Sequence, residues 1–102
     1  MQTMHINESN FRAEVLNSEQ PVLLDYYAPW CGPCRLVAPI LEEIAAENPH
    51  IKVGKVNVDQ EAALAKQFRT YTIPTLVVMK NGVITQQVVG ARSKAQILEL
   101  LS

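Results

Sequence analysis

The chain has 102 residues, a formal net charge of −1, 48% hydrophobic and 19% charged residues, which is typical of one soluble globular domain spanning residues 1–102. This balance indicates no electrostatic partner such as nucleic acid or a membrane surface, and no apolar stretch approaches the roughly 20 residues of a bilayer-spanning helix. Residues 1–5 lack a signal-peptide pattern, so we expect a cytoplasmic protein, or one of an organelle lumen or stroma if a leader has been removed.

Hydrophobic periodicity and turn signals divide the chain into nine short elements. In chain order they are a strand over 4–6, a helix over 10–16, a strand over 22–28, a helix over 31–48, a strand over 51–58, a helix over 59–68, strands over 75–79 and 83–89, and a helix after Ser93. The third element is almost continuously apolar, which is typical of a strand buried on both faces.

Local signals mark several of these boundaries. Asn7 or Ser9 can cap the first helix, Asp59 the third and Ser93 the last. An Asn-Gly pair at 81–82 predicts a two-residue hairpin. The order βαβαβαββα implies parallel pairing across the helices and antiparallel pairing in the hairpin. The sequence therefore predicts an α/β fold with a central mixed sheet of five strands and helices on both faces.

Both cysteines, Cys31 and Cys34, stand at the start of the predicted long helix. At this spacing on a helix the Cβ atoms lie roughly 5–6 Å apart, whereas a disulfide needs roughly 3.5–4.5 Å, so the first turn must tighten. Gly32 tolerates unusual dihedral angles, and Pro33 stiffens a first turn without losing a hydrogen bond. This arrangement is typical of a reversible redox switch.

The two cysteines have different positions on that helix. Unpaired N–H groups at a helix start favour a thiolate, which is the nucleophile of disulfide chemistry. Cys31 lies nearer to this end, so we assign it as the attacking thiol and Cys34 as the buried resolving thiol. Cys31 attacks a substrate disulfide to give a mixed disulfide, and Cys34 then releases a dithiol product. No bound cofactor is needed, because the cysteines themselves carry the electrons.

Other uses of the cysteine pair fit less well. A zinc site needs two more ligands, and His5 and His50 are isolated from each other, so we predict no metal. Haem attachment requires a histidine after Cys34, where the chain has Arg35. A structural disulfide that closes so short a loop would add little stability.

Asp25, Lys55 and Trp30 each have both a functional and an ordinary interpretation. Asp25 is either a solvated or paired strand acid, or a buried acid with a raised pKa that exchanges protons with Cys34; its apolar surroundings favour the second. Lys55 is either a surface lysine or a group that modulates the proton affinity of Asp25. Trp30 is either a core residue or a cover over the sulfur.

The segment Trp30-Cys31-Gly32-Pro33-Cys34, together with Asp25 and Ile73-Pro74-Thr75, resembles the thioredoxin family. The similarity extends from Phe11 to the final helix. It implies the thioredoxin fold, with two helices on each face of the sheet, and reduction of protein disulfides. It also implies re-reduction by a thioredoxin reductase, either NADPH- or ferredoxin-linked. No obvious extra interface is present, so we expect a monomer.

The resemblance also implies roles for individual residues. Cys31 matches the family nucleophile, Cys34 its resolving partner, Asp25 the buried acid and Lys55 the lysine on the neighbouring strand. Pro74 matches the cis-proline that faces the disulfide and docks substrate backbone. The expected substrate-binding residues are Trp30, Gly32, Pro33, Thr72, Ile73, Pro74, Gly90 and Ala91.

The chain departs from the family pattern at two places near the expected active surface. Tyr26-Tyr27 replaces the commoner Phe-Trp, and Tyr71-Thr72 replaces the usual residues before Ile73. We expect these changes to bear on partner preference more than on chemistry. Two alternatives are a non-catalytic thioredoxin-fold binding subunit of a larger complex and a disulfide oxidant or isomerase, although the Gly-Pro pair resembles the reducing branch.

Overall fold

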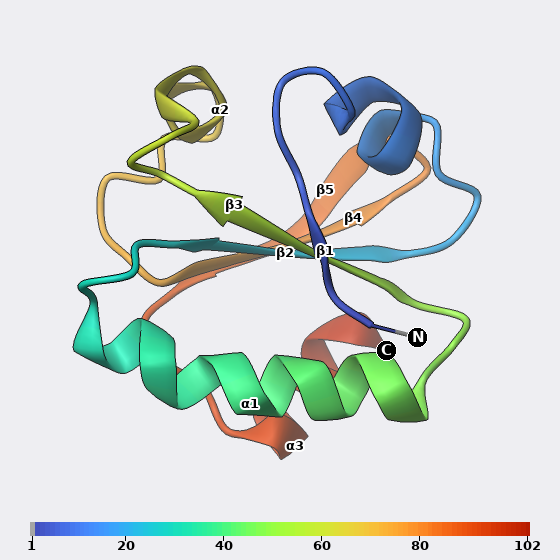
Figure 1. Ribbon diagram of the computed structural model, residues 1–102. Helices are drawn as coiled ribbons and strands as arrows, with labels where there is room; N and C mark the ends of the chain where they lie inside the picture. Colours follow the sequence, from blue (N-terminus) through green and yellow to red (C-terminus); the bar gives the residue numbers. More distant parts are fainter. Residues whose placement is uncertain (1) are drawn as a thin grey trace.

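The computed structural model describes residues 2–102, which form a five-stranded sheet with helices on both faces (Figure 1). The strands are β1 (Met4–His5), β2 (Val22–Tyr27), β3 (Lys52–Asn57), β4 (Thr75–Lys80) and β5 (Val83–Val89). The helices are η1 (Arg12–Leu16), which is a short π-helix, α1 (Gly32–Glu47), α2 (Ala62–Gln67) and α3 (Lys94–Leu101). Within residues 2–102, no helix has both the length and the apolar character needed to cross a bilayer.

The sheet is mixed, as predicted, with the strand order β1-β3-β2-β4-β5. Strands β1, β3 and β2 are parallel, whereas β4 and β5 are antiparallel to their neighbours. Strand β2 therefore lies at the centre, and its residues 22–26 are all buried. The register places Asp25 between Lys55 of β3 and Leu76 of β4.

Two helices cover each face of the sheet, which confirms the predicted architecture (Figure 1). Helices η1 and α2 pack on the face to which Leu24 and Tyr26 contribute. Helices α1 and α3 pack on the opposite face, to which Leu23 contributes. Because side chains alternate along a strand, Asp25 points in the same direction as Leu23, toward α1.

The predicted hairpin turn at Asn81 and Gly82 and the predicted helix cap at Ser93 both form. Asn81 and Gly82 both have positive φ, 54° and 77°, as the two-residue turn between β4 and β5 requires. Ser93 caps α3 with a reciprocal pair of hydrogen bonds. Its Oγ accepts from the N–H of Gln96 at 3.2 Å, and the Gln96 side chain accepts from the N–H of Ser93 at 2.9 Å.

The predicted cap at Asp59 is wrong. Helix α2 begins only at Ala62, its N-cap is Glu61, and no side chain of residues 2–102 caps it. Asp59 lies in the preceding turn, and its carboxylate accepts a hydrogen bond from Trp30 instead. The first predicted helix is also shorter than expected, because η1 begins at Arg12.

Candidate active site

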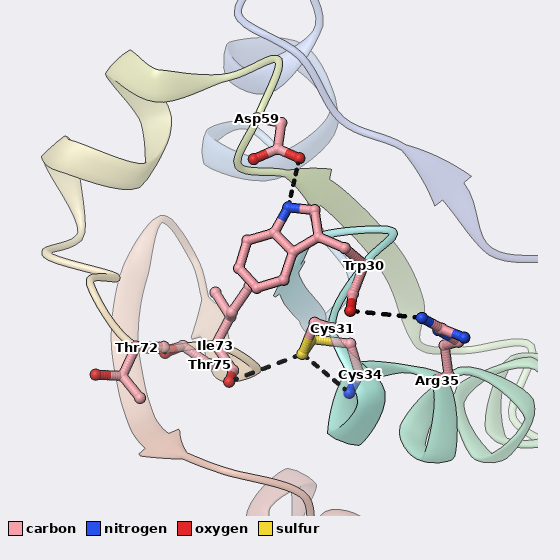
Figure 2. Close-up of a disulfide and its surroundings, with 8 residues drawn as sticks. All are labelled: Trp30, Cys31, Cys34, Arg35, Asp59, Thr72, Ile73 and Thr75. Atoms are coloured by element: carbon pink, nitrogen blue, oxygen red, sulfur yellow. Dashed lines mark hydrogen bonds between the residues drawn. A yellow bond between two sulfur atoms is a disulfide. The ribbon is translucent and has the colours of Figure 1, made fainter.

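Cys31 and Cys34 form a disulfide where β2 leads into α1, with their Cα atoms 5.3 Å apart (Figure 2). Cys31 is the N-cap residue of α1 and has an extended backbone. Its Sγ accepts a hydrogen bond from the N–H of Cys34 at 3.2 Å. Pro33 stands in the first turn, where its missing N–H would have had no helical partner anyway. The sulfur of Cys31 thus lies at the end of the helix that favours negative charge.

The disulfide is almost covered by protein. The exposed fraction is 5% for Cys31 and 3% for Cys34, so the two residues differ little in burial in the oxidised state. Gly32 and Pro33 between them are exposed. The helix position of Cys31, rather than its exposure, is therefore what distinguishes it from Cys34.

The loop before β4 lies against the disulfide. The carbonyl oxygen of Ile73 is 3.9 Å from the Sγ of Cys31, although the two residues are 42 positions apart (Figure 2). The Ile73–Pro74 peptide bond is cis, and Pro74 is buried. The hydroxyl of Thr75 donates to the carbonyl of Thr72 at 2.5 Å and so closes this loop. Residues 72–74 are therefore held beside Cys31.

Trp30 lies on the surface and is not a core residue, because 66% of it is exposed. Figure 2 shows its indole directed toward Asp59, with Nε1 donating to Oδ2 at 2.9 Å. Gly90 joins the same region, since its N–H donates to the carbonyl of Pro74 at 2.8 Å. Ala91 follows Gly90 and is exposed. An exposed rim around the nearly buried disulfide is thus formed by Trp30, Gly32, Pro33 and Ala91.

Asp59 is a member of this rim that sequence reasoning missed. The sequence contains only part of the signal, because it is the structure that shows β2 and β3 to be parallel neighbours with their carboxyl ends at the same edge of the sheet. Asp59 follows β3 just as Trp30 follows β2. Two polar groups in those positions can therefore meet.

Asp25 is a buried acid. Only 1% of it is exposed, and neither carboxylate oxygen has a hydrogen-bond partner within residues 2–102. Burial raises the pKa of the Asp25 carboxyl from 3.8 to about 6, and the positive charge of Lys55 partly opposes this effect. The interpretation of Asp25 as a solvated or paired strand acid therefore does not fit.

Lys55 is half-buried rather than a free surface lysine. Its Nζ lies 4.6 Å from the centroid of the Tyr27 ring. Both side chains line a pocket of about 100 Å³ that also reaches Cys34 and Arg35. Lys55 therefore shares a pocket with Cys34, and it is also the register partner of Asp25 on the neighbouring strand.

Two pockets larger than the one beside Cys34 lie elsewhere. One of about 450 Å³ lies between β5 and α3, and one of about 280 Å³ lies between η1 and α2. Neither contains a residue that the sequence predicts for the site. Within residues 2–102, no group of three or more His, Cys, Asp or Glu side chains is arranged to hold a metal ion.

Comparison with known proteins agrees with this geometry. Residues 2–102 match the thioredoxin family. The thioredoxin of Haemophilus influenzae is 43% identical over 102 residues, which cover 99% of this chain and 95% of that protein. The thioredoxin of Mycolicibacterium smegmatis is 45% identical over 103 aligned positions, covering 98% and 92%. The bifunctional thioredoxin reductase/thioredoxin of Mycobacterium leprae is 43% identical over 101 residues, covering 98% of this chain and 22% of that protein.

These matches extend over nearly the whole chain, and they coincide with a Cys-Gly-Pro-Cys disulfide at the start of a helix. A disulfide in this position can be opened and closed by thiol–disulfide exchange. The chain therefore belongs to the thioredoxin family and is a thiol–disulfide oxidoreductase, a protein-disulfide reductase whose redox-active pair is Cys31 and Cys34.

Proposed function

We propose that this chain acts in the cytoplasm as a monomer with a single domain over residues 1–102, and that Cys31 is its nucleophile and Cys34 its resolving thiol. The observation that carries the assignment is the hydrogen bond from the N–H of Cys34 to the Sγ of Cys31 at the start of α1. Such N–H groups stabilise a thiolate at Cys31 once the disulfide is reduced.

The proposed reaction has two exchange steps. The Cys31 thiolate attacks one sulfur of a substrate disulfide, so that bond breaks, a mixed disulfide forms and the departing sulfur takes up a proton. Cys34 then loses its proton and attacks the Sγ of Cys31. The mixed disulfide breaks, the substrate leaves as a dithiol, and the Cys31–Cys34 disulfide is regenerated. Two electrons have moved from this chain to the substrate.

Asp25 is the proposed acceptor of the proton that Cys34 loses. A carboxylate with a pKa of about 6 is mostly ionised at neutral pH, yet holds a proton better than an ordinary aspartate. Its side chain points toward α1, and Lys55 and Cys34 share one small pocket. Lys55 is proposed to adjust the proton affinity of Asp25 through its charge.

The rim around the disulfide is the proposed docking surface for partner proteins. A substrate segment would lay its backbone along residues 72–74, next to the Sγ of Cys31. The exposure of Trp30 and the position of Ile73 beside that sulfur support this role. The proposed substrate-binding residues are Trp30, Gly32, Pro33, Thr72, Ile73, Pro74, Gly90 and Ala91.

Disulfide-containing proteins and a thioredoxin reductase are the proposed partners, and neither nucleic acid nor a membrane is among them. The Mycobacterium leprae relative, whose name joins a reductase and a thioredoxin in one protein, supports a reductase as electron donor. That donor would be NADPH- or ferredoxin-linked. The proposed chemistry requires no bound cofactor, because the electrons reside in Cys31 and Cys34.

Reduction of insulin by dithiothreitol tests this proposal. We expect the intact chain to accelerate the reaction, Cys31→Ser to abolish the acceleration, and Cys34→Ser to accumulate a mixed disulfide with the substrate. An intact chain without turnover would indicate the binding-subunit alternative instead. A redox potential measured against a purified thioredoxin reductase separates a reductase from an oxidant or isomerase.

A further inference from the structure

The ammonium group of Lys55 lies over the ring of Tyr27, the last residue of β2. The 4.6 Å between Nζ and the ring centroid is within the range of about 6 Å at which a cation is attracted to an aromatic face. Both residues are half-buried, and the attraction strengthens as water is excluded. The pair is therefore a specific contact between β2 and β3.

The contact lies directly beside Asp25. Asp25 and Tyr27 are two residues apart on β2, so their side chains lie on the same face of the sheet. Lys55 is the partner of Asp25 in the β2–β3 register. The acid, the ring and the ammonium group therefore form a triangle on the α1 face, and two of them line the pocket that reaches Cys34.

Other interactions do not explain where the ammonium group lies. Within residues 2–102, the salt bridges involve Lys52 and Lys94 and not Lys55, and the oxygens of Asp25 accept no hydrogen bond. A lysine ends in a strongly hydrated ammonium group on a flexible four-carbon stem. Such a group tends to extend toward water unless a partner holds it.

We propose that Tyr27 is a positioning residue whose ring face holds the ammonium group of Lys55 beside Asp25 and next to the pocket that reaches Cys34. This inference rests on the proposed role of Asp25 in proton transfer. Without the ring, Lys55 extends into solvent, and the Asp25 carboxylate loses a nearby positive charge. Any aromatic ring at position 27 provides the face, and the hydroxyl is not required.

Few other titratable groups lie around Asp25. On α1, Arg35 and Cys34 line the shared pocket, and on β4 the register partner is the apolar Leu76. In the oxidised protein Cys34 is held in the disulfide and does not titrate. Burial, and next the charge of Asp25, raise the pKa of the Tyr27 hydroxyl, so it stays neutral while Asp25 titrates.

The test is a ¹³C NMR titration of the Asp25 carboxyl carbon in the oxidised protein. Lys55→Met should raise the midpoint, because it removes the charge that favours the carboxylate. Tyr27→Leu should also raise it, by no more than Lys55→Met does, whereas Tyr27→Phe and Tyr27→Trp should stay close to the original chain. In the Lys55→Met background, Tyr27→Leu should cause no further shift.

Three outcomes would overturn the proposal: no shift in Tyr27→Leu, a shift larger than that of Lys55→Met, or an equal shift in both backgrounds. A second measurement needs no variant. If Lys55 lies over the ring, its ε-methylene protons resonate upfield of those of the other lysines, and an unshifted signal contradicts the contact. Neither measurement uses turnover, so insulin reduction can persist while this inference fails, or fail while it holds.

Discussion

The indole Nε1 of Trp30 donates a 2.9 Å hydrogen bond to Oδ2 of Asp59, 29 residues further along the chain. The bond joins the loop after β2 to the turn after β3, which adjoin because these strands are parallel neighbours. It restrains a side chain that is otherwise two-thirds exposed and stands next to the disulfide. One aspartate thereby orders part of the proposed docking rim.

Removing that carboxylate should loosen the indole. We expect Asp59→Ala to speed the local motion of Trp30, measured as a faster decay of fluorescence anisotropy, and to slow insulin reduction severalfold. Trp30 is the sole tryptophan of the chain, so the fluorescence reports on it alone. The free energy of unfolding should fall by no more than about 1 kcal/mol, because the bond is exposed. Asp59→Asn, which keeps an acceptor oxygen, is the control; unchanged anisotropy in Asp59→Ala would contradict the restraint.

Asp25 makes the stability of the protein depend on pH. Its pKa is about 6 when folded and 3.8 ordinarily, so ionisation is easier in the unfolded chain, and stability falls as pH rises from about 4 to about 6. At about 1.4 kcal/mol per pH unit, the loss approaches about 3 kcal/mol. Asparagine does not ionise, so the variant Asp25→Asn should not show this loss. Its free energy of unfolding relative to that of the original chain should increase by up to about 3 kcal/mol between pH 4 and pH 8. Denaturant unfolding at both pH values measures this gain, and a variant that gains nothing would show that the acid is not desolvated.

The hydroxyl of Tyr26 is buried and has no hydrogen-bond partner within residues 2–102. Its ring packs 5.9 Å from that of Phe68, in the core under η1 and α2. A buried polar group without a partner costs about 1–3 kcal/mol, so Tyr26→Phe should raise the free energy of unfolding by about 1 kcal/mol. Tyr71→Phe makes the same chemical change at a residue that is 79% exposed and should have little effect. A marked loss of stability in Tyr26→Phe would mean that the hydroxyl has a partner.

Gly54 has no side chain, and the side chain of Ile6, in the segment after β1, occupies the space beside it. A Cβ at this position would lie 2.6 Å from Cγ1 of Ile6 and 3.1 Å from Cδ2 of Leu24. Overpacking of this kind costs about 1–3 kcal/mol, so Gly54→Ala should lower the urea midpoint accordingly. In an Ile6→Ala background the obstructing atom is gone, and the cost should shrink. An equal cost in both backgrounds would show that Ile6 is not the obstacle.

Elements that depend on neighbours in sequence could be predicted from the sequence. The hairpin at Asn81 and Gly82 and the cap at Ser93 use only residues within one turn, and both form as expected. Asp59 shows the limit of this reasoning. Its type and spacing favour a helix cap, but Trp30 competes for the same carboxylate from another part of the chain.

The disulfide and its place at the start of α1 were determined by the sequence itself, because two cysteines three positions apart meet within a single turn of helix. The approach of Ile73 to Cys31 was expected only from the family resemblance. The contacts of Trp30 with Asp59 and of Lys55 with Tyr27 were decided by the tertiary structure alone. Both contacts depend on the order and register of β2 and β3. Strand register is set when the sheet packs between its helices, so it cannot be read from any one short segment of the sequence.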